Sequence, residues 1–379
     1  MQPLNKFILG EDTIKETDVA GISSTVKDNK IDTNRIDLSQ FEAIYITDAL
    51  VRNSINASVC LFDYDYEIVA SSPRIRRETE KFMKFINYDS LKLELAKNAF
   101  IYGDGWLELV YKNNEFLGVV NLNPKRVDYK KDMNGRILLD SKGKIEGYTQ
   151  TIGYEQSSDK NLKGKVEMVN GVPVIILKPE QIAHFYFDSI GEGWYGIGLI
   201  EPIYSITLGK NEAEMGLSHV INKVGFPIVI NKIGSPEHVP TPEMIEEGAK
   251  IVKDLNYKTE LTVPYYMDID TLKITRIEKL REYLQYFLEQ QITGIGIPGG
   301  IATGSGESIN RSTLVTQVKM FMKINESRRK KQVNQFENTV LKTLAKSRGW
   351  KEIPTIKIIP TDLDDILKDI KKEKKGEIG

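Results

Sequence analysis

A long stretch without helix breakers constrains this chain more than any other feature of its sequence. Residues 307–348 are 42 residues with no glycine and no proline. The apolar side chains recur at helical spacing, at Leu314, Val318, Phe321, Met322, Val333, Phe336, Val340, Leu341 and Leu344. This pattern predicts one very long helix over 314–348. Because the apolar stripe lapses over "NESRRKKQ", residues 325–332, we expect the helix either to kink there or to be exposed on all sides.

Two further long helices are predicted on either side of a small insert. Apolar positions three and four apart run through residues 199–224, with Pro202 at the entry, and again through 276–293. The insert, residues 225–275, has strand candidates at 226–233 and 258–267. They flank a helix candidate at 241–256, for which Thr241 is the expected N-cap, Pro242 the first helical residue and Asn256 the end.

The N-terminal half mixes helices with many short strands. Residues 1–36 are polar and read as a loosely ordered arm. A helix of about five turns is expected from Ser39, and two shorter helices at 75–86 and 89–101. Eight alternating stretches follow up to residue 187, separated by turn residues such as Asn113-Asn114. The fold class is therefore α+β, and "IPTIKIIPTDL" adds a strand near the C-terminus.

The stretch "GIGIPGGIATGSG", residues 294–306, contains a G-x-G-x-x-G match at Gly294, Gly296 and Gly299. A dinucleotide site needs a strand before this motif and an acidic residue about 20 positions later. Here a predicted helix precedes it, and "LVTQVKMFMK" supplies no acid. A P-loop also fails, since Ser305 and Gly306 stand where Lys and Ser/Thr are needed. We therefore expect a hinge-like loop over 294–313, with no cofactor.

Composition narrows the class of protein further. The formal net charge of −1 gives no general attraction to DNA or to anionic membranes. The single cysteine, Cys60, cannot form an internal disulfide and is expected to be buried. Three scattered histidines offer no metal site, and His184 is expected to be a structural histidine on a strand. No signal peptide, membrane span or catalytic motif is evident, so we expect no enzyme and no catalytic residues.

Four stretches, in this order, resemble the portal proteins of tailed bacteriophages, in particular the HK97-like portals. They are "FIYGDGWLELV", "VNLNPKRVDYKKDMNGRI", "EQIAHFYFDSIGEGWYGIGLIEPIYSITLGKNEAE" and "ITGIGIPGGI". The resemblance covers roughly residues 40–365. It rests on the order and spacing of these stretches together with the sequence of helix, insert, helix, glycine loop and long helix.

The resemblance implies a ring, commonly of twelve subunits, at one capsid vertex of the virion, assembled in the host cytoplasm. Double-stranded DNA would pass through the ring during packaging and ejection. The other implied partners are the terminase large subunit, the head–tail adaptor and the major capsid protein, with no membrane. A nucleotide-binding enzyme that uses residues 294–306, and another virion adaptor or scaffold component, remain the alternatives.

The resemblance also assigns a role to each segment. The expected parts are an arm (1–36), a wing (37–198 and 314–348), two stem helices (199–224 and 276–293), a clip (225–275), a tunnel loop (294–313), and a C-terminal strand with a short crown stub (349–379). The DNA-facing residues would be Thr303, Ser305, Asn310, Arg311 and Ser312. The motor-facing residues of the clip would be Glu246, Glu247, Lys250, Lys253 and Asp254.

The charges of the expected tunnel loop and of the long helix behind it can be interpreted in two ways. Duplex DNA carries one phosphate charge per roughly 1.7 Å, so a sliding channel needs few strong contacts. The loop offers one Arg and one Glu, whereas residues 307–348 hold ten Lys and Arg against three Asp and Glu. The segment "RRKK", residues 328–331, is either a source of longer-range attraction to DNA or acidic neighbours, or only a solvated face.

Overall fold

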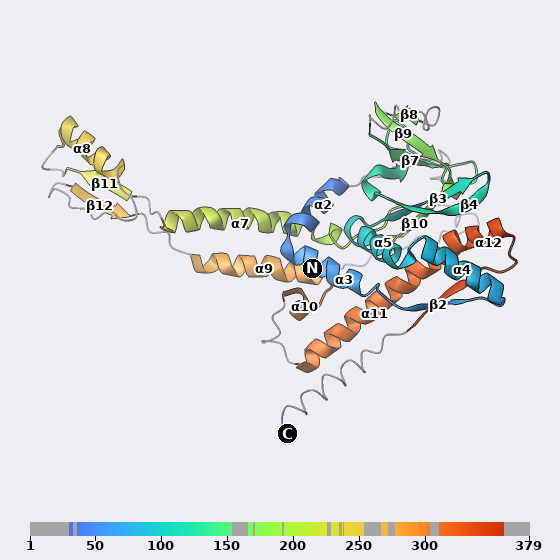
Figure 1. Ribbon diagram of the computed structural model, residues 1–379. Coiled ribbons are helices and arrows are strands. Elements are labelled where there is room, and N and C mark those ends of the chain that lie inside the picture. The colour runs from blue at the N-terminus through green and yellow to red at the C-terminus, as the bar shows by residue number, and fades with distance from the viewer. Residues whose placement is uncertain are drawn as a thin grey trace, which may run out of the picture. The chain divides into compact units, whose positions relative to one another are not determined.

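A computed structural model describes residues 30–32, 36–153, 166–169, 171–191, 193–225, 229–234, 237, 239–253, 267–271, 277–303 and 311–359. The chain forms two compact units. One contains Met1–Glu201 and Ile297–Gly379, and the other is Pro202–Gly296. The chain thus leaves the first unit once and returns to it once. Both units combine helices with antiparallel strands (Figure 1), which confirms the predicted α+β class.

The first unit begins with two helices where the sequence predicts one. The segment from Ser39 is divided into α2 (Leu38–Thr47) and α3 (Ala49–Cys60). Asp48 adopts an extended backbone between them, and its carboxylate accepts a hydrogen bond from a backbone N–H in the first turn of α3. The N-cap of α2 is Asp37 rather than Ser39. A capping aspartate can end one helix and begin the next while the apolar residues keep their helical spacing. The spacing of apolar residues alone therefore does not reveal the break.

The remaining elements of the first unit form four small sheets packed on helices. The other helices are α4 (Pro73–Phe85), α5 (Tyr88–Tyr102), α10 (Gly299–Thr303), α11 (Arg311–Phe336), the π-helical segment η6 (Glu337–Leu341) and α12 (Lys342–Arg348). The strands are β1 (Lys30–Asp32), β2 (Tyr66–Val69), β3 (Gly105–Lys112), β4 (Glu115–Leu122), β5 (Val127–Tyr129), β6 (Arg136–Leu138), β7 (Tyr148–Thr151), β8 (Val166–Val169), β9 (Val172–Leu177), β10 (Ile182–Phe185) and β13 (Thr355–Ile358).

The strand orders are β10-β3-β4, β5-β7-β9-β8, β13-β2 and β1-β6. The turn residues predicted from sequence account for several of the connections. Asn113 and Asn114 join β3 to β4 with φ values of 51° and 64°. Two positive φ values in succession match the twist of a tight hairpin, and asparagine tolerates them better than most residues. This turn is therefore confirmed.

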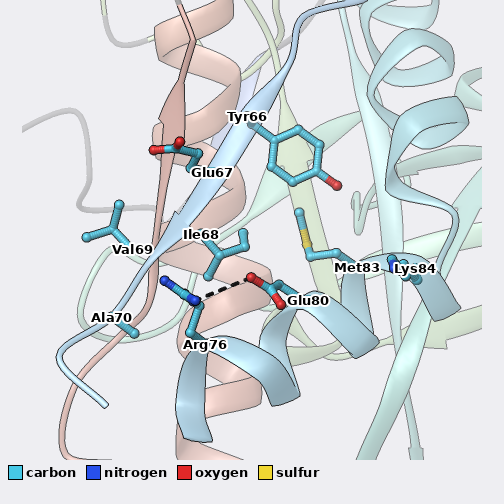
Figure 2. Close-up of a pocket in the computed structure, with 9 residues that line it drawn as sticks. All are labelled: Tyr66, Glu67, Ile68, Val69, Ala70, Arg76, Glu80, Met83 and Lys84. Atoms are coloured by element: carbon cyan, nitrogen blue, oxygen red, sulfur yellow. Dashed lines mark ion pairs between the residues drawn. The ribbon is translucent and has the colours of Figure 1, made fainter. Parts of the chain in front are cut away.

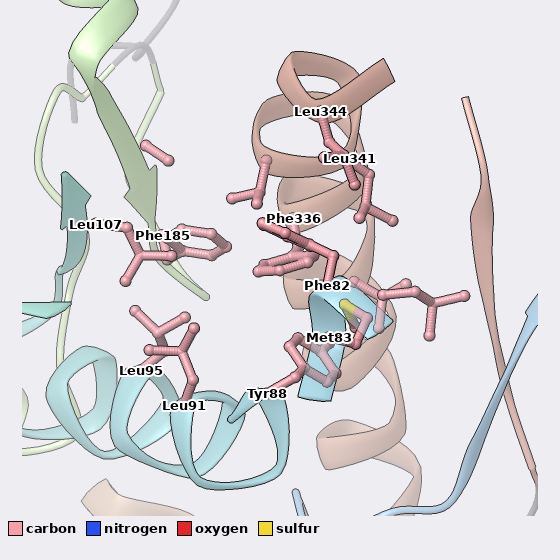
Figure 3. Packing of buried hydrophobic residues seen from close by; sticks show 14 of the residues in the cluster. Phe82, Met83, Tyr88, Leu91, Leu95, Leu107, Phe185, Phe336, Leu341 and Leu344 are labelled. Atoms are coloured by element: carbon pink, nitrogen blue, oxygen red, sulfur yellow. The ribbon is translucent and has the colours of Figure 1, made fainter. Parts of the chain in front are cut away.

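The long C-terminal helix supplies one side of the main core. Figure 3 shows Phe336, Leu341 and Leu344 from this helix facing buried side chains of α4, α5, β3 and β10. The ring of Phe336 lies 4.8 Å from that of Tyr88 and 6.4 Å from that of Phe185, measured between centroids. The helix begins at Arg311, three residues before the predicted start, and its irregularity is the π-helical turn at Glu337–Leu341.

The expectation for residues 325–332 is wrong in both of its forms. The helix neither kinks there nor lies in solvent, because polar side chains continue the buried stripe. Asn325 and Gln332 are fully buried and Arg329 is 8% exposed. Gln332 donates to the Lys92 backbone carbonyl at 2.9 Å, and Asn325 donates to the carbonyl one turn back. Buried polar groups with hydrogen-bond partners replace apolar ones at little cost, and an apolar count cannot detect them.

The second unit holds a helix pair and a small α/β insert. Its elements are α7 (Tyr204–Gly225), β11 (Val229–Ile233), α8 (Pro242–Lys253), β12 (Met267–Thr271) and α9 (Ile277–Ile295). The hydroxyl of Thr241 accepts a hydrogen bond from the α8 backbone at 3.4 Å, which confirms this N-cap. The second strand, β12, overlaps the predicted 258–267 at Met267 and continues to Thr271. Asn256 and the rest of that predicted strand lie outside the described residues.

The side chain of Cys60 is exposed, so the expectation of a buried cysteine is wrong. Cys60 ends α3, whose buried residues are Val51, Ser54, Ile55 and Ser58. Two residues beyond Ser58 a helix has turned about half a revolution, toward solvent. Apolar neighbours in sequence therefore say little about which face of a helix a residue occupies.

Candidate functional site

The glycine-rich segment between α9 and α11 is only partly a loop. Helix α9 ends at Ile295, and Gly296 follows with φ 74°, the left-handed conformation that glycine adopts without strain. Its N–H bonds back to carbonyls in the last turn of α9. Pro298 then starts the short helix α10 by accepting backbone hydrogen bonds from Ile301 and Ala302. The predicted loop over 294–313 is therefore corrected: it contains a short helix and the first turn of α11.

The structure places the five predicted DNA-facing residues as follows. Thr303 is the last residue of α10, and its exposed hydroxyl donates to the Gly299 carbonyl at 2.9 Å. Arg311 and Ser312 occupy the first turn of α11. Ser305 and Asn310 lie outside the described residues. The described backbone thus puts Thr303 and Arg311 at the two ends of one connector.

One residue that the sequence analysis missed holds the C-terminal end of α10 in place. The side-chain amide of Asn53, on α3, donates to the Ala302 carbonyl at 3.2 Å and more weakly to that of Ile301. The last carbonyls of a helix lack partners within it, so this contact satisfies groups that would otherwise need water. A lone asparagine on an amphipathic helix gives no sequence signal for this role.

The geometry disfavours a nucleotide site at the G-x-G-x-x-G match. Gly294 lies inside helix α9 and Gly299 begins a five-residue helix, so no strand enters the motif within the described part of the chain. Gly294 instead has a packing role. A Cβ at this position would lie 2.3 Å from Cγ2 of Ile203. Glycine is needed here because α9 approaches Ile203 closely, and no bound phosphate is required to explain it.

Helices α7 and α9 pack side by side through small and polar residues (Figure 1). A Cβ on Gly209 would lie 3.3 Å from the ring of Phe287. Buried Gln291 donates to the hydroxyl of buried Thr207 at 3.0 Å. The same two helices expose large apolar side chains elsewhere, at Leu208, Met215, Tyr283 and Tyr286. Exposed Tyr and Met side chains of this kind are typical of surfaces that contact other proteins.

Helix α8 carries most of the predicted clip residues on a solvated face. Glu246 and Lys250 form an ion pair at 3.5 Å one turn apart, and both side chains are more than 70% exposed. Glu247 is exposed as well, and Lys253 is the last residue of α8. Asp254 lies outside the described residues. An exposed pair of this kind contributes little to stability, so these charges are available to a partner.

The basic segment "RRKK" packs partly against the first unit, with Arg329 buried and Arg328 and Lys331 half-buried. Arg328 lies over the Phe100 ring at 5.4 Å, and Arg329 over the Tyr64 ring at 5.9 Å. Lys331 donates to the Phe187 carbonyl at 3.1 Å. Burial lowers the pKa of all three groups from their ordinary values. The solvated-face interpretation therefore holds only for Lys330, which is exposed and pairs with Glu326 at 2.7 Å.

Two of the sequence stretches that carry the resemblance meet at a glycine contact. A Cβ on Gly196 would lie 2.1 Å from the Gly103 carbonyl oxygen, and one on Gly103 would be equally close to Gly196. Gly103 also has a φ of 88°. Fully buried Asp104 accepts hydrogen bonds from the Gly196 N–H at 2.6 Å and from His184 Nε2 at 2.7 Å. The backbone crossing and the buried carboxylate together fix the start of β3 against the segment before α7.

His184 has the structural role expected of it. Its ring stacks on Trp106 with 4.0 Å between centroids and 9° between planes. Its Nδ1 atom lies 3.2 Å from the hydroxyl of Tyr129. Among the described residues, no group of His, Cys, Asp and Glu side chains has the arrangement of a metal site. Among the same residues, no helix is long and apolar enough to span a membrane.

Known proteins resemble this chain in structure but not in sequence. No protein-family model matches the sequence, and no curated protein matches it. A chain in the virion of a native gene transfer agent (GTA) particle matches with a TM-score of 0.61 and 12% identity, over 95% of this chain and 94% of that one. A chain in the neck of the native GTA particle, computed with C12 symmetry, matches with a TM-score of 0.62 and 12% identity, over 94% of each.

A third solved structure, an HK97 family phage portal protein from Corynebacterium diphtheriae, matches with a TM-score of 0.45 and 10% identity. The match covers 85% of this chain and 96% of that one. The two GTA matches extend over nearly the whole of both chains. The chain therefore has the fold of a chain found in the neck of gene transfer agent particles.

Proposed function

We propose that the chain is a portal protein: a ring-forming subunit at one vertex of a phage-like capsid, through which double-stranded DNA is packaged and ejected. The observation that carries this proposal is the shared fold with a GTA neck chain, over nearly the full length of both. The C12 symmetry of that neck supports a ring of twelve copies. The portal-like order of the sequence stretches supports it independently. The location would be the virion, after assembly in the host cytoplasm.

The parts of the chain then take distinct roles. The first unit would be the wing, α7 and α9 the stem, and the insert between them the clip. The clip would dock the terminase large subunit and later the head–tail adaptor, with Glu246, Glu247 and Lys250 among the exposed residues of α8. The exposed apolar side chains of α7 and α9, including Tyr283 and Tyr286, would pack against neighbouring copies. The wing would contact the major capsid protein.

The connector between α10 and α11 would face the channel. Thr303 and Arg311 stand at its two ends, and Ser305, Asn310 and Ser312 complete the predicted set. A translocating duplex needs weak, exchangeable contacts rather than a strong basic clamp. The packing of buried Arg329 and half-buried Arg328 and Lys331 against aromatic rings and a backbone carbonyl fits this requirement, because it limits how far these charges can reach toward DNA.

A deletion within the connector tests this function directly. Removing residues 303–309 is expected to leave assembly intact and to reduce the yield of DNA-filled particles by at least tenfold. Replacing the same residues by a Gly/Ser segment of equal length is the matched control for chain length. Packaged DNA per particle, measured after nuclease treatment, is the readout. Normal DNA-filled particles from the deletion would contradict the assignment of this connector to the channel.

A further inference from the structure

A groove in the first unit lies between strand β2 and helix α4, away from the segments discussed above. Figure 2 shows it lined by five consecutive residues of the strand side, Tyr66 to Ala70, and by Arg76, Glu80, Met83 and Lys84 from the helix. Its volume is about 500 Å³. All four residues of β2 and the following Ala70 line it, because the backbone edge of β2, rather than one side-chain face, forms its wall.

This edge of β2 has unused hydrogen-bonding groups. In the described part of the chain, β2 pairs only with β13. The Ile359 N–H bonds to the Asp65 carbonyl at 2.9 Å, and the register continues antiparallel from there. Because ladder bonds alternate along an antiparallel pair, Glu67 and Val69 direct their backbone groups to β13. Tyr66 and Ile68 therefore direct theirs into the groove. An open edge beside a helix is the arrangement to which extended peptides add as an extra strand.

Only one of the two faces of β2 at this edge is lined by apolar side chains. Tyr66 and Ile68 face the core, and Ile68 is 6% exposed. Met83 of α4 lies on the same side (Figure 2). Val69 and Glu67 point the opposite way and are exposed. Alternate residues of an added strand would lie on this side, next to half-exposed Tyr66 and at the edge of the core formed by Ile68 and Met83.

The charges of the groove set a direction for such a strand. Helix α4 follows β2 after a short turn and runs back along it, so Arg76 lies near Ala70 and Lys84 near Tyr66 (Figure 2). Arg76 is paired with Glu80 at 3.6 Å. Lys84 has no ion-pair partner among the described residues. A strand antiparallel to β2 would end beside Lys84, where acidic residues are favoured.

We propose that this groove binds the chain's own N-terminal segment, and that residues 6–10 add to β2 as an antiparallel strand. Residues 1–29 contain one run of three large apolar residues, Phe7, Ile8 and Leu9, followed by Glu11 and Asp12. Placing Phe7 opposite Ile68 and Leu9 opposite Tyr66 buries both side chains in the groove. The same register brings Glu11 and Asp12 to Lys84.

The connection to the rest of the chain is long enough for this placement. Residues 10–29 span up to roughly 65 Å when extended, which exceeds the width of a compact unit of this size. Attachment to the same chain also gives the segment an effective concentration in the millimolar range. The proposal requires only a single chain, so it is independent of ring formation and of the portal function.

Disulfide trapping in the full-length chain tests the proposed register. Ile8 and Glu67 would be directly opposed on the outward face of the added strand, at a pair without mutual hydrogen bonds, where Cβ atoms come closest. Cys60 is replaced by serine, and Ile8→Cys is combined with Glu67→Cys. The control combines Ile8→Cys with Met133→Cys, because Met133 is 92% exposed and lies outside the groove. Diamide oxidation is followed by non-reducing gel electrophoresis.

We expect the Ile8–Glu67 cysteine pair to form an intrachain disulfide at least tenfold faster than the control pair. Adding Lys84→Glu should slow it several-fold at low ionic strength, and Glu11→Lys with Asp12→Lys should restore the rate. Equal rates for the two pairs would overturn the proposal. A product of twice the mass would also overturn it, since the bound segment would then belong to a second copy. All variants are checked for unchanged thermal unfolding.

Discussion

Single residues in this chain show where sequence patterns inform and where they do not. His184 could be assigned correctly, because an alternating strand places a lone histidine among packed neighbours. Cys60 could not, because its surroundings along the chain differ from its surroundings in space. The contact between Gly103 and Gly196 could not be predicted either, since the two residues are 93 positions apart and nothing in either stretch indicates that their backbones meet.

The glycine contact leads to a prediction about stability. Gly196→Ala would place a Cβ 2.1 Å from the Gly103 carbonyl oxygen, a backbone atom that cannot move alone. We expect a loss of about 3 kcal/mol or more in the free energy of unfolding, measured by urea denaturation. Gly216→Ala is the control, because nothing lies near a Cβ there and a helix interior favours alanine by about 1 kcal/mol. Equal stability of the two variants would contradict the close approach.

A second prediction concerns the pH dependence of stability at Glu337. Burial raises the pKa of this carboxyl above its ordinary value of 4.5, although its Oε1 accepts the Ile356 N–H at 2.5 Å. The folded state therefore disfavours the charged form, and this penalty appears as the pH rises through the raised folded pKa. Glu337→Gln keeps an acceptor and removes the charge, so it should raise the urea midpoint at pH 7 and have little effect near pH 4.

Glu352 supplies the control of opposite sign for that experiment. Hydrogen bonds from the Ser71 side chain and from the backbone N–H groups of Ser71 and Ser72 lower the pKa of the Glu352 carboxyl. Its contribution to stability is present above the ordinary pKa and is lost as the pH falls through the lowered one. Glu352→Gln should therefore lower the midpoint at pH 7. A lower midpoint at pH 7 for Glu337→Gln would show that its hydrogen bond outweighs the burial of its charge.

At the scale of elements, the sequence predicted the helices better than their boundaries or their surroundings. Apolar periodicity located α7 and α9 within a few residues, and the shorter helices α4 and α5 also lie within two residues of their predicted bounds. It failed for the middle of α11, where buried polar groups with hydrogen-bond partners replace apolar ones. Residues 294–313 were predicted as one loop, because the five residues of α10 are too few to show a helical period.

The packing of α7 against α9 can be tested through a buried polar pair. Thr207 and Gln291 are fully buried and joined by a 3.0 Å hydrogen bond. Thr207→Val or Gln291→Leu alone should cost about 1–3 kcal/mol, since each removes one side of a buried hydrogen bond. The double variant should cost clearly less than the sum. Additive losses in urea denaturation would mean that the two side chains do not depend on each other.

For the whole molecule, the proposed portal function is inferred from the order of helices and strands rather than from a catalytic or ligand-binding motif. The G-x-G-x-x-G match lost its significance once helices were found on both sides of it, and the same glycines serve turning and close packing. The fold class could be predicted from the sequence alone. The positions of Ser305 and Asn310 could not, and their contact with DNA stays a prediction. The proposed role of the exposed tyrosines on α9 involves neighbouring copies, so the sequence of one chain could not reveal it.

Electron microscopy of the purified full-length protein tests the central claim most directly. A portal function predicts closed rings, with twelve copies as the expected number and a central channel wide enough for duplex DNA. Two-dimensional class averages and mass photometry give the symmetry and the copy number independently. Replacing Tyr283 and Tyr286 by glutamate should reduce the ring fraction, whereas the same change at exposed Met168 on β8 should not. A protein that stays monomeric under several assembly conditions, or forms rings without such a channel, would contradict the portal assignment.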